Sequence, residues 1–238
     1  MSRRRFGLWA AAAVVLAVVG LYGLFKVSKA RCFTLTGSVV CRVETARPAV
    51  ALTFDDGPTE RGLEAVLPVL EAHGARATFF LVGREAAQRP DLVRRITAAG
   101  HEVENHSWSH RRMAFRWGDS YTHELRRTEA VLDGDRGPGP RLFRPPYGKK
   151  LVGLPLAVEA EGLTMVTWDV EEPTTTDPAR FAQEIVAQAK PGSIILMHPM
   201  YGANETARAA LPRVLQGLKA KGLEVVPAGE LIASGAER

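Results

Sequence analysis

Two hydrophobic patterns alternate along the chain from Ala49 onward. Short apolar runs, typical of buried strands, are separated by longer amphipathic stretches, typical of surface helices. Seven strands that alternate with helices predict a parallel α/β architecture, either a barrel or an open sheet. The predicted strands are Val50–Phe54, Ala77–Val82, Glu102–Asn105, Leu142–Arg144, Thr164–Trp168, Ser193–Met197 and Glu224–Val226.

Glycine residues mark the ends of the amphipathic stretches. A glycine just past an apolar periodic stretch is a helix-stop signal, because glycine adopts the left-handed conformation without strain. A further candidate helix, Lys150–Glu161, is interrupted by Pro155. The helices predicted on this signal are Glu60–His73, Arg84–Ala99, Ser120–Leu132, Pro178–Ala189 and Glu205–Lys221.

The N-terminal residues have a different pattern. Phe6 to Phe25 is a run of 20 residues without a charge, and a helix of that length spans about 30 Å, the thickness of a hydrocarbon core. Because Arg3–Arg5 precede it, we expect a transmembrane anchor with its N-terminus in the cytoplasm. The alternative is a cleaved signal peptide, with Ser28-Lys29-Ala30 as the cleavage site. Either way, the rest of the chain is expected to be periplasmic or extracellular.

The net positive charge of the chain belongs to its N-terminal residues and not to the rest of the protein. The 238 residues include 31 Lys+Arg and 26 Asp+Glu, a formal net charge of +5. Residues 1–31 hold six of the basic residues and no acidic one, so the other 207 residues carry a formal charge of −1. Such a body lacks the basic cluster that binds phosphates, which argues against a nucleic-acid partner. No feature of the sequence specifies an oligomeric state.

The two cysteines, Cys32 and Cys41, fit an exported chain. They flank a stretch that could form a short hairpin around Gly37-Ser38. In an oxidising compartment they could form a disulfide; the alternative is two unrelated thiols. We therefore divide the chain into an anchor at 1–31, a hairpin or linker at 32–46 and a catalytic domain at 47–235.

Reactive residues follow the first and third predicted strands, and in parallel α/β folds chemistry lies beyond the carboxyl ends of strands. Asp55 and Asp56 follow the first strand, where one could bind a metal and the other act as a base; the alternative is ordinary turn chemistry. His106 and His110 follow the third strand. Two histidines four apart can share one side of a helical turn and bind zinc, unless they are two surface histidines by chance.

Two further strand ends carry candidates. Arg144 follows the fourth strand, and its guanidinium is suited to orienting a carboxylate, although it could be a surface arginine on a rigid loop. His198 follows the sixth strand, where it would either titrate in a functional site or be a hydrogen-bonded core histidine. With a carboxylate, the histidine pair would form a two-His-one-carboxylate site with open positions.

The order of these motifs resembles the polysaccharide deacetylase family with the NodB homology domain (carbohydrate esterase family four). The resemblance covers roughly Arg47 to Leu231. It is carried by Thr53-Phe54-Asp55-Asp56-Gly57-Pro58, His106-Ser107-Trp108-Ser109-His110, Arg144-Pro145-Pro146-Tyr147 and Leu196-Met197-His198, with Gly100-His101-Glu102 leading into the histidine pair.

That resemblance implies a distorted (β/α) barrel that removes N- or O-acetyl groups from glycans with one divalent metal, usually zinc, although cobalt or iron would also fit the ligands. It implies Asp55 as catalytic base, with Arg144 holding it, and His198 as catalytic acid. The metal ligands would be Asp56, His106 and His110. Residues implied at the substrate or oxyanion are Tyr147, Leu196 and Trp168.

One motif departs from the family pattern. The family commonly has Asp-x-x-Asp-Trp after the fifth strand, with an Asp that supports the catalytic histidine. Alignment on Trp168 puts Glu171 at the first Asp, Thr174 at the second and Thr175 at the Trp. One expected wall of the sugar groove is therefore missing. The candidates for support of the catalytic histidine are Asp169, Glu171 and Asp177.

The expected activity is hydrolysis of N-acetyl groups on an N-acetylglucosamine-containing glycan, such as peptidoglycan, a chitin-type oligomer or an exopolysaccharide. An alternative is an O-acetyl esterase on xylan or another O-acetylated glycan. Hydrolysis of small cyclic amides is a further alternative, and the export signal argues against it. An inactive membrane-tethered glycan-binding protein is the third, and the complete set of base, metal ligands and catalytic histidine argues against it.

Overall fold

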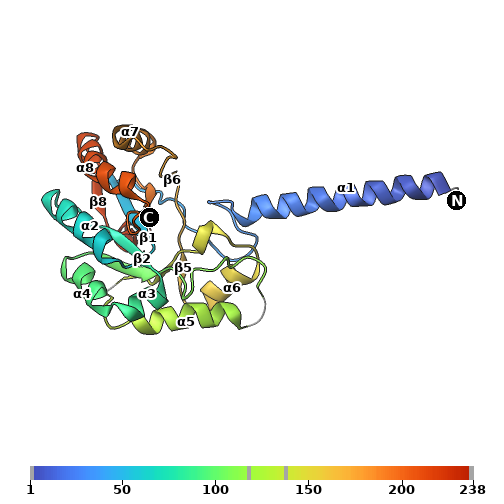
Figure 1. The fold of residues 1–238 in the computed structure, drawn as a ribbon, viewed down its shortest axis with the longest axis horizontal. Helices are drawn as coiled ribbons and strands as arrows, with labels where there is room; N and C mark the ends of the chain where they lie inside the picture. The colour runs from blue at the N-terminus through green and yellow to red at the C-terminus, as the bar shows by residue number, and fades with distance from the viewer. Residues whose placement is uncertain (1–2, 117–118, 137–138, 236–238) are drawn as a thin grey trace.

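The computed structural model describes residues 3–116, 119–136 and 139–235 (Figure 1). Its strands are β1 (Ala49–Asp55), β2 (Thr78–Leu81), β3 (Glu102–Asn105), β4 (Leu142–Phe143), β5 (Thr164–Met165), β6 (Val170–Glu171), β7 (Ile194–Met197) and β8 (Glu224–Val226). Its helices are α1 (Arg3–Ser28), α2 (Glu60–Ala72), α3 (Gly83–Gln88), α4 (Pro90–Ala98), α5 (Ser120–Leu132), α6 (Gly153–Ala160), α7 (Pro178–Gln188), α8 (Glu205–Ala220) and α9 (Ala228–Gly235), with a 3₁₀ turn, η1, at Pro146–Gly148.

The strands form one parallel sheet. Its order is β5-β4-β3-β2-β1-β7-β6, and β8 pairs with the first half of β1. In the described part of the chain no pairing joins β5 to β6, so the structure is a distorted barrel with one open seam. The predicted parallel α/β barrel is confirmed, and each of the seven predicted strands is present. Strand β6 was not predicted, because its two residues, Val170 and Glu171, lie in no apolar run.

The segment after the N-terminal helix fills this seam. Val40 pairs with Val166, just after β5, and Arg42 pairs with Ser193, just before β7. Residues 33–40 form no strand pairing with one another, so of the two alternatives, hairpin or linker, the structure has the linker. Cys32 and Cys41 form a disulfide that closes the loop leading into the seam.

Strand β1 explains how the interior is built. Successive side chains of a strand point to opposite faces. Val50, Leu52 and Phe54 pack in the core between the sheet and the outer helices. Ala49 and Ala51 pack in the barrel interior, and the same alternation directs Thr53 and Asp55 inward. Small residues thus give way to polar ones toward the carboxyl end of the strand.

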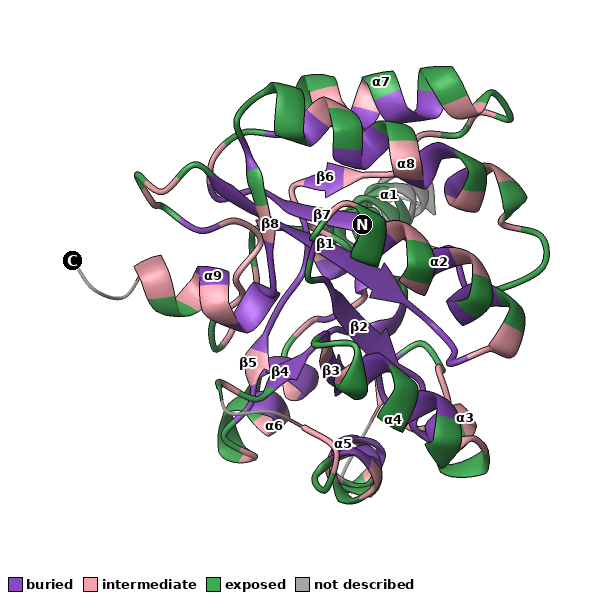
Figure 2. Cartoon of the chain, turned by 90° about the vertical axis from the view of Figure 1, so that its left-hand side faces the viewer, coloured by how far each residue is buried: buried purple, intermediate pink, exposed green. Residues whose placement is uncertain are grey.

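The helices cover the outside of the sheet, with buried faces inward and exposed faces outward (Figure 2). The predicted helix Arg84–Ala99 is two helices, α3 and α4, because Pro90 has no backbone N–H and disfavours helical geometry at Arg89, where φ is −132° and ψ is 60°. The short helix α9 was not predicted from the sequence.

The N-terminal helix α1 projects away from the barrel (Figure 1). Across the described residues, the structure contains no helix with both the length and the apolar character needed to cross a membrane. The predicted transmembrane helix is therefore not supported by the structure. Near the end of α1 the chain meets the barrel, where the Lys150 N–H donates to the Ser28 carbonyl at 2.7 Å.

Candidate active site

Asp55 and Arg144 form a buried ion pair at the carboxyl end of β1. Nη1 of Arg144 donates to Oδ1 of Asp55 and to Oγ1 of Thr53, both at 2.7 Å. Nη2 donates to the Thr167 carbonyl at 3.1 Å, and the guanidinium lies 4.0 Å from the centre of the Phe80 ring. The arginine has no exposed surface, so the surface-loop alternative for Arg144 was wrong. It fixes one carboxylate oxygen of Asp55 and leaves the other free.

Asp56, His106 and His110 lie together beside this pair. One potential ligand atom from each lies within 4.8 Å of the others. Nε2 of His110 is 3.3 Å from Oδ1 of Asp56, and Nε2 of His106 is 3.9 Å from the same oxygen. That oxygen is buried and has no hydrogen-bond partner. A buried unpaired carboxylate oxygen is costly, so the three residues fit a divalent cation.

A second contact prepares His106 as a ligand. Its Nδ1 lies 2.9 Å from the Arg144 carbonyl oxygen, which can only accept a hydrogen bond. Nδ1 therefore carries the proton, and the lone pair of Nε2 points toward the aspartates. The backbone that supports Asp55 thus also orients a metal ligand.

The histidine pair is held by a loop and not by the predicted helical turn. Ser107 and His110 have positive φ angles of 65° and 55°. The Ser107 N–H donates to Oδ1 of Asn105 at 2.8 Å, and the His110 N–H donates to Oγ of Ser107 at 3.1 Å. Ser109 donates to the Glu124 carboxylate through its N–H and its hydroxyl. These side-chain bonds stabilise the bent backbone that aims both imidazoles at Asp56.

Burial and charge separate the pKa values of these groups. Burial lowers the pKa of His106 to about 4, which keeps the imidazole neutral, as a ligand must be. Burial and then the Asp55 charge raise the pKa of Asp56 to about 6. Burial would also raise the pKa of Asp55, but the charges of Arg144, His106 and His198 and the hydrogen bond from Arg144 together lower it. Asp55 therefore stays ionised. A bound cation would stabilise the ionised form of Asp56, which burial and the Asp55 charge disfavour.

His198 is supported by Glu172, which the sequence analysis did not select. Its Nδ1 lies 2.8 Å from Oε1 of Glu172, and its backbone N–H donates to Oε2 at 3.0 Å. Burial lowers the pKa of His198, but the hydrogen bond to Glu172 and the Asp55 charge raise it to about 9. The imidazole is therefore protonated at neutral pH. The His198 side chain is 31% exposed and lines the cleft, so the core-histidine alternative was wrong.

The three carboxylates suggested for this role have other partners. Asp169 accepts hydrogen bonds from Oγ of Ser193 and the N–H of Ile194, both at 2.8 Å. Glu171 pairs with Arg31, and Asp177 caps the N-terminus of α7. These assignments were wrong because β6 pairs with β7 in a register that puts the next residue, Glu172, beside His198. The only sequence signal for the role of Glu172 was its place in the series Glu171-Glu172-Pro173.

The two aspartates and the three histidines, His106, His110 and His198, open into one cleft of about 500 Å³. Tyr147, Leu196 and Trp168 line it, as the resemblance implied. Tyr147 has φ 59° and ψ 16°, and its ring centre is 4.9 Å from that of His110. Asn204 also lines the cleft and donates from Nδ2 to the His198 carbonyl, a contact that the sequence analysis missed.

Where the family's tryptophan is replaced, the structure has a second hollow of about 510 Å³. Thr174 and Thr175 line it, together with apolar residues such as Phe181. It shares Glu172 and Asn204 with the catalytic cleft. The position of the missing wall is thus a depression of mixed polar and apolar lining next to the reactive groups.

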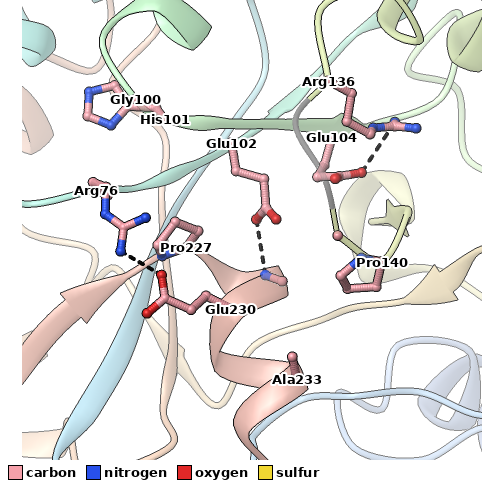
Figure 3. A pocket seen from close by; sticks show the side chains of 12 residues that line it. Arg76, Gly100, His101, Glu102, Glu104, Arg136, Pro140, Pro227, Glu230 and Ala233 are labelled. Atoms are coloured by element: carbon pink, nitrogen blue, oxygen red, sulfur yellow. Dashed lines mark hydrogen bonds and ion pairs between the residues drawn. The ribbon is translucent and has the colours of Figure 1, made fainter.

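A separate cavity of about 420 Å³ lies near the amino ends of β2 and β3 (Figure 3). Its charged groups satisfy one another: Arg76 donates to Glu230, Arg136 pairs with Glu104, and Glu102 accepts from the Gly229 N–H. In the cleft, by contrast, the Asp56 oxygen is unpaired. The cleft is therefore the better candidate for chemistry.

Comparison with known proteins agrees with this geometry. A family model described as polysaccharide deacetylase matches residues 42–166. A peptidoglycan-N-acetylglucosamine deacetylase of Bacillus cereus is 33% identical over 195 residues, which are 79% of this chain and 70% of that protein. The chain belongs to the polysaccharide deacetylase family. It is therefore a hydrolase that acts on carbon–nitrogen bonds other than peptide bonds.

Other relatives of this deacetylase differ in length and named substrate. A chitooligosaccharide deacetylase of Azorhizobium caulinodans is 32% identical over 200 residues, 78% of this chain and 95% of that protein. The peptidoglycan-N-acetylglucosamine deacetylase PgdA of Listeria monocytogenes is 34% identical over 184 residues, and the match spans only 38% of its length. The solved Bc1960 peptidoglycan N-acetylglucosamine deacetylase matches with a TM-score of 0.77 at 30% identity, over 84% of this chain and 95% of that one.

Proposed function

We propose that this protein removes N-acetyl groups from an N-acetylglucosamine-containing glycan of the cell envelope and releases acetate. The observation that carries the proposal is the grouping of one cleft's reactive residues. An unpaired carboxylate oxygen of Asp56 faces two imidazoles, while Asp55 and His198 each have a charged partner that fixes their protonation state. Amide hydrolysis needs this separation of one base from one acid.

The metal is proposed to be zinc, with cobalt or iron as alternatives that the same ligands accept. Asp56, His106 and His110 would hold it. When bound, a divalent ion polarises the acetyl carbonyl and lowers the pKa of a coordinated water. Three protein ligands leave open positions for water and substrate, as in catalytic zinc sites.

Asp55 would act as the general base. Its Oδ1 is occupied by Arg144, whereas Oδ2 lies 3.6 Å from Nε2 of His106, next to the ligand cluster. Because the Arg144 charge lowers its pKa, the carboxylate is ionised and can take the proton of the attacking water. Arg144 is thus a positioning residue that fixes the direction of the free oxygen.

His198 would act as the general acid. Glu172 fixes the ring through Nδ1 and leaves Nε2 to donate its proton to the departing amine nitrogen. The tetrahedral oxyanion would be stabilised in part by the backbone N–H of Tyr147, whose left-handed turn lines the cleft. Leu196 and Trp168 would contact the acetyl group and the sugar.

The substrate class rests on the relatives, which are named for peptidoglycan and for chitin-type oligomers. Acetate release by the purified, zinc-loaded protein from peptidoglycan and from N-acetylglucosamine oligomers tests the proposal. We expect release from both, and Asp55→Asn should reduce it by about three orders of magnitude or more while the protein keeps its metal. Release only from O-acetylated xylan would contradict the proposal, and loss of metal in Asp55→Asn would mean that the two aspartate roles are reversed.

We also propose that the catalytic domain lies outside the cytoplasm. The disulfide between Cys32 and Cys41 supports this location, because such bonds persist in oxidising compartments. Whether the N-terminal helix anchors the protein in a membrane or is removed at Ser28-Lys29-Ala30 is decided by the intact mass of protein taken from cells. The redox state of the two cysteines in cells tests the location itself.

A further inference from the structure

A third hollow of about 400 Å³ adjoins the catalytic cleft and is basic. It shares Tyr147, Trp168 and Glu171 with the cleft. Its other side is formed by residues at and just after the end of α1, with Lys26, Lys29 and Arg31 among them. These three cations belong to the N-terminal segment, outside residues 42–166, which the family model matches.

Hydrogen bonds fix this N-terminal segment to the catalytic domain. The Lys150 N–H donates to the Ser28 carbonyl at 2.7 Å, and the Thr167 hydroxyl donates to the Arg31 carbonyl at 2.7 Å. The Lys150 ammonium, which is fully buried, donates to the Ala30 carbonyl. Residues 28–31 are therefore part of the wall of the active-site region and not a free linker.

The charges in this hollow do not cancel. Glu171 pairs with Arg31, whose guanidinium also lies 5.8 Å from the Trp168 ring centre. The ammonium groups of Lys26 and Lys29 lie over the rings of Tyr22 and Phe25, at 5.5 and 4.5 Å from the ring centres. No carboxylate in the described parts of the chain forms an ion pair with either lysine. Two exposed positive charges therefore remain next to the catalytic cleft.

We infer that this hollow is a subsite for an anionic group, a carboxylate or a phosphate, carried by the glycan whose acetylated sugar occupies the catalytic cleft. The inference rests on the proposed function, because it places the anion on the same substrate. A sugar near Tyr147 and Trp168 would bring a substituent of a neighbouring residue toward Lys26 and Lys29. The lysines would then favour anionic glycans over neutral ones through a charge interaction weakened by salt.

Affinity and acetate release are measured together on the full chain. The probes are an N-acetylglucosamine tetramer, the same tetramer with a lactyl carboxylate on alternate sugars, and the same tetramer with a phosphate on alternate sugars. The variant is Lys26→Gln/Lys29→Gln, and the control is Lys219→Gln, which removes an exposed charge from α8. We expect the double variant to bind one or both anionic tetramers about three- to tenfold more weakly and to bind the neutral tetramer with unchanged affinity. The affinity of the double variant for the anionic tetramers should no longer depend on salt concentration.

Binding separates the subsite from the chemistry. Lysine-dependent preference for an anionic tetramer without acetate release would support the subsite and contradict the proposed function. The subsite would be overturned if the wild type bound all three tetramers with equal affinity. It would also be overturned if the double variant lost the same affinity for the neutral tetramer as for the anionic ones. An intact mass showing that the mature chain begins at Arg31 would overturn it as well. Unchanged glycan affinities with lost sedimentation on phosphatidylglycerol vesicles would also overturn it, and would assign the lysines to a lipid surface.

Discussion

At the scale of single residues, each reactive group is prepared by a partner of opposite charge. Arg144 lowers the pKa of Asp55, and Glu172 raises that of His198. The two shifts act in opposite directions, so the base is ionised and the acid is protonated over one common range of pH. A deacetylase with these pairs should work from mildly acidic conditions up to the pKa of His198, which is about 9.

Replacement of Glu172 tests this division of roles. Protonated His198 is the acid, so activity is lost as the pH rises through its pKa. Glu172→Gln removes the hydrogen-bonded charge that raises this pKa, and the alkaline limb of kcat should move down by about one pH unit or more. The pH profile of acetate release between pH 5 and 10 measures this shift.

Asp177→Asn is the matched control, because it also neutralises a carboxylate but one that only caps α7. Its alkaline limb should coincide with that of the wild type. If Glu172→Gln lowered kcat equally at every pH, Glu172 would act on position alone and the charge argument for His198 would fail.

At the scale of elements, the sequence predicts which residues follow the carboxyl ends of the strands. It does not predict which side chains contact them there. The apolar runs before Asp55, His106 and His198 gave correct strands, and parallel strands bring their carboxyl ends together. Strand β6, which consists of Val170 and Glu171, lies in no apolar run that a pattern could reveal, unlike the equally short β4 and β5. Glu172 was missed for that reason, because its proximity to His198 depends on the register of β6 against β7.

The loop that carries the histidine pair shows the same limit. A spacing of four suggested a helical turn, but the structure uses positive φ angles at Ser107 and His110. These angles depend on bonds to Asn105 and, through Ser109, to Glu124 of α5. The first of these bonds is local, but the second joins residues 15 apart and has no periodic signal in the sequence. The ligand residue types could be recognised from the sequence, and the backbone that holds them could not.

The turn η1 supports a prediction at this scale. Gly148 has φ 62°, and a Cβ there would lie 3.0 Å from the Trp168 ring. Gly148→Ala should therefore lower the free energy of unfolding by about 1–2 kcal/mol from backbone strain, and also push Trp168 into the cleft, so that KM rises. Urea unfolding and acetate-release kinetics measure the two effects.

Gly100→Ala separates the strain from the contact. Gly100 has φ 81°, but nothing lies within 4 Å of the position that a Cβ would take there, and it is far along the chain from η1. The Gly100→Ala variant should lose a similar free energy of unfolding, and its KM should equal that of the wild type. Equal KM values for the two variants would show that the Trp168 contact does not shape the cleft.

At the scale of the whole molecule, the open seam of the barrel explains the N-terminal segment. With no pairing between β5 and β6 in the described residues, the backbone around Val40 and Arg42 supplies bonds to both sides of the seam. The disulfide restrains the loop that feeds this segment, and the same loop begins beside the basic hollow. Closure of the barrel and the position of residues 26–31 are therefore linked through one short stretch of chain.

The disulfide gives the prediction for the whole molecule. The sequence separation of its cysteines is 9, and closing a loop of that size contributes about 2–3 kcal/mol in the chain-entropy model. Cys32→Ser/Cys41→Ser should lose about that much free energy of unfolding in urea, and dithiothreitol should lower the wild type to the same value. Protein alkylated directly in cell lysates should show no free thiol, as expected outside the cytoplasm. Free thiols in that sample would contradict the exported location. If dithiothreitol did not change the free energy of unfolding of the wild type, the bond would have no restraining role.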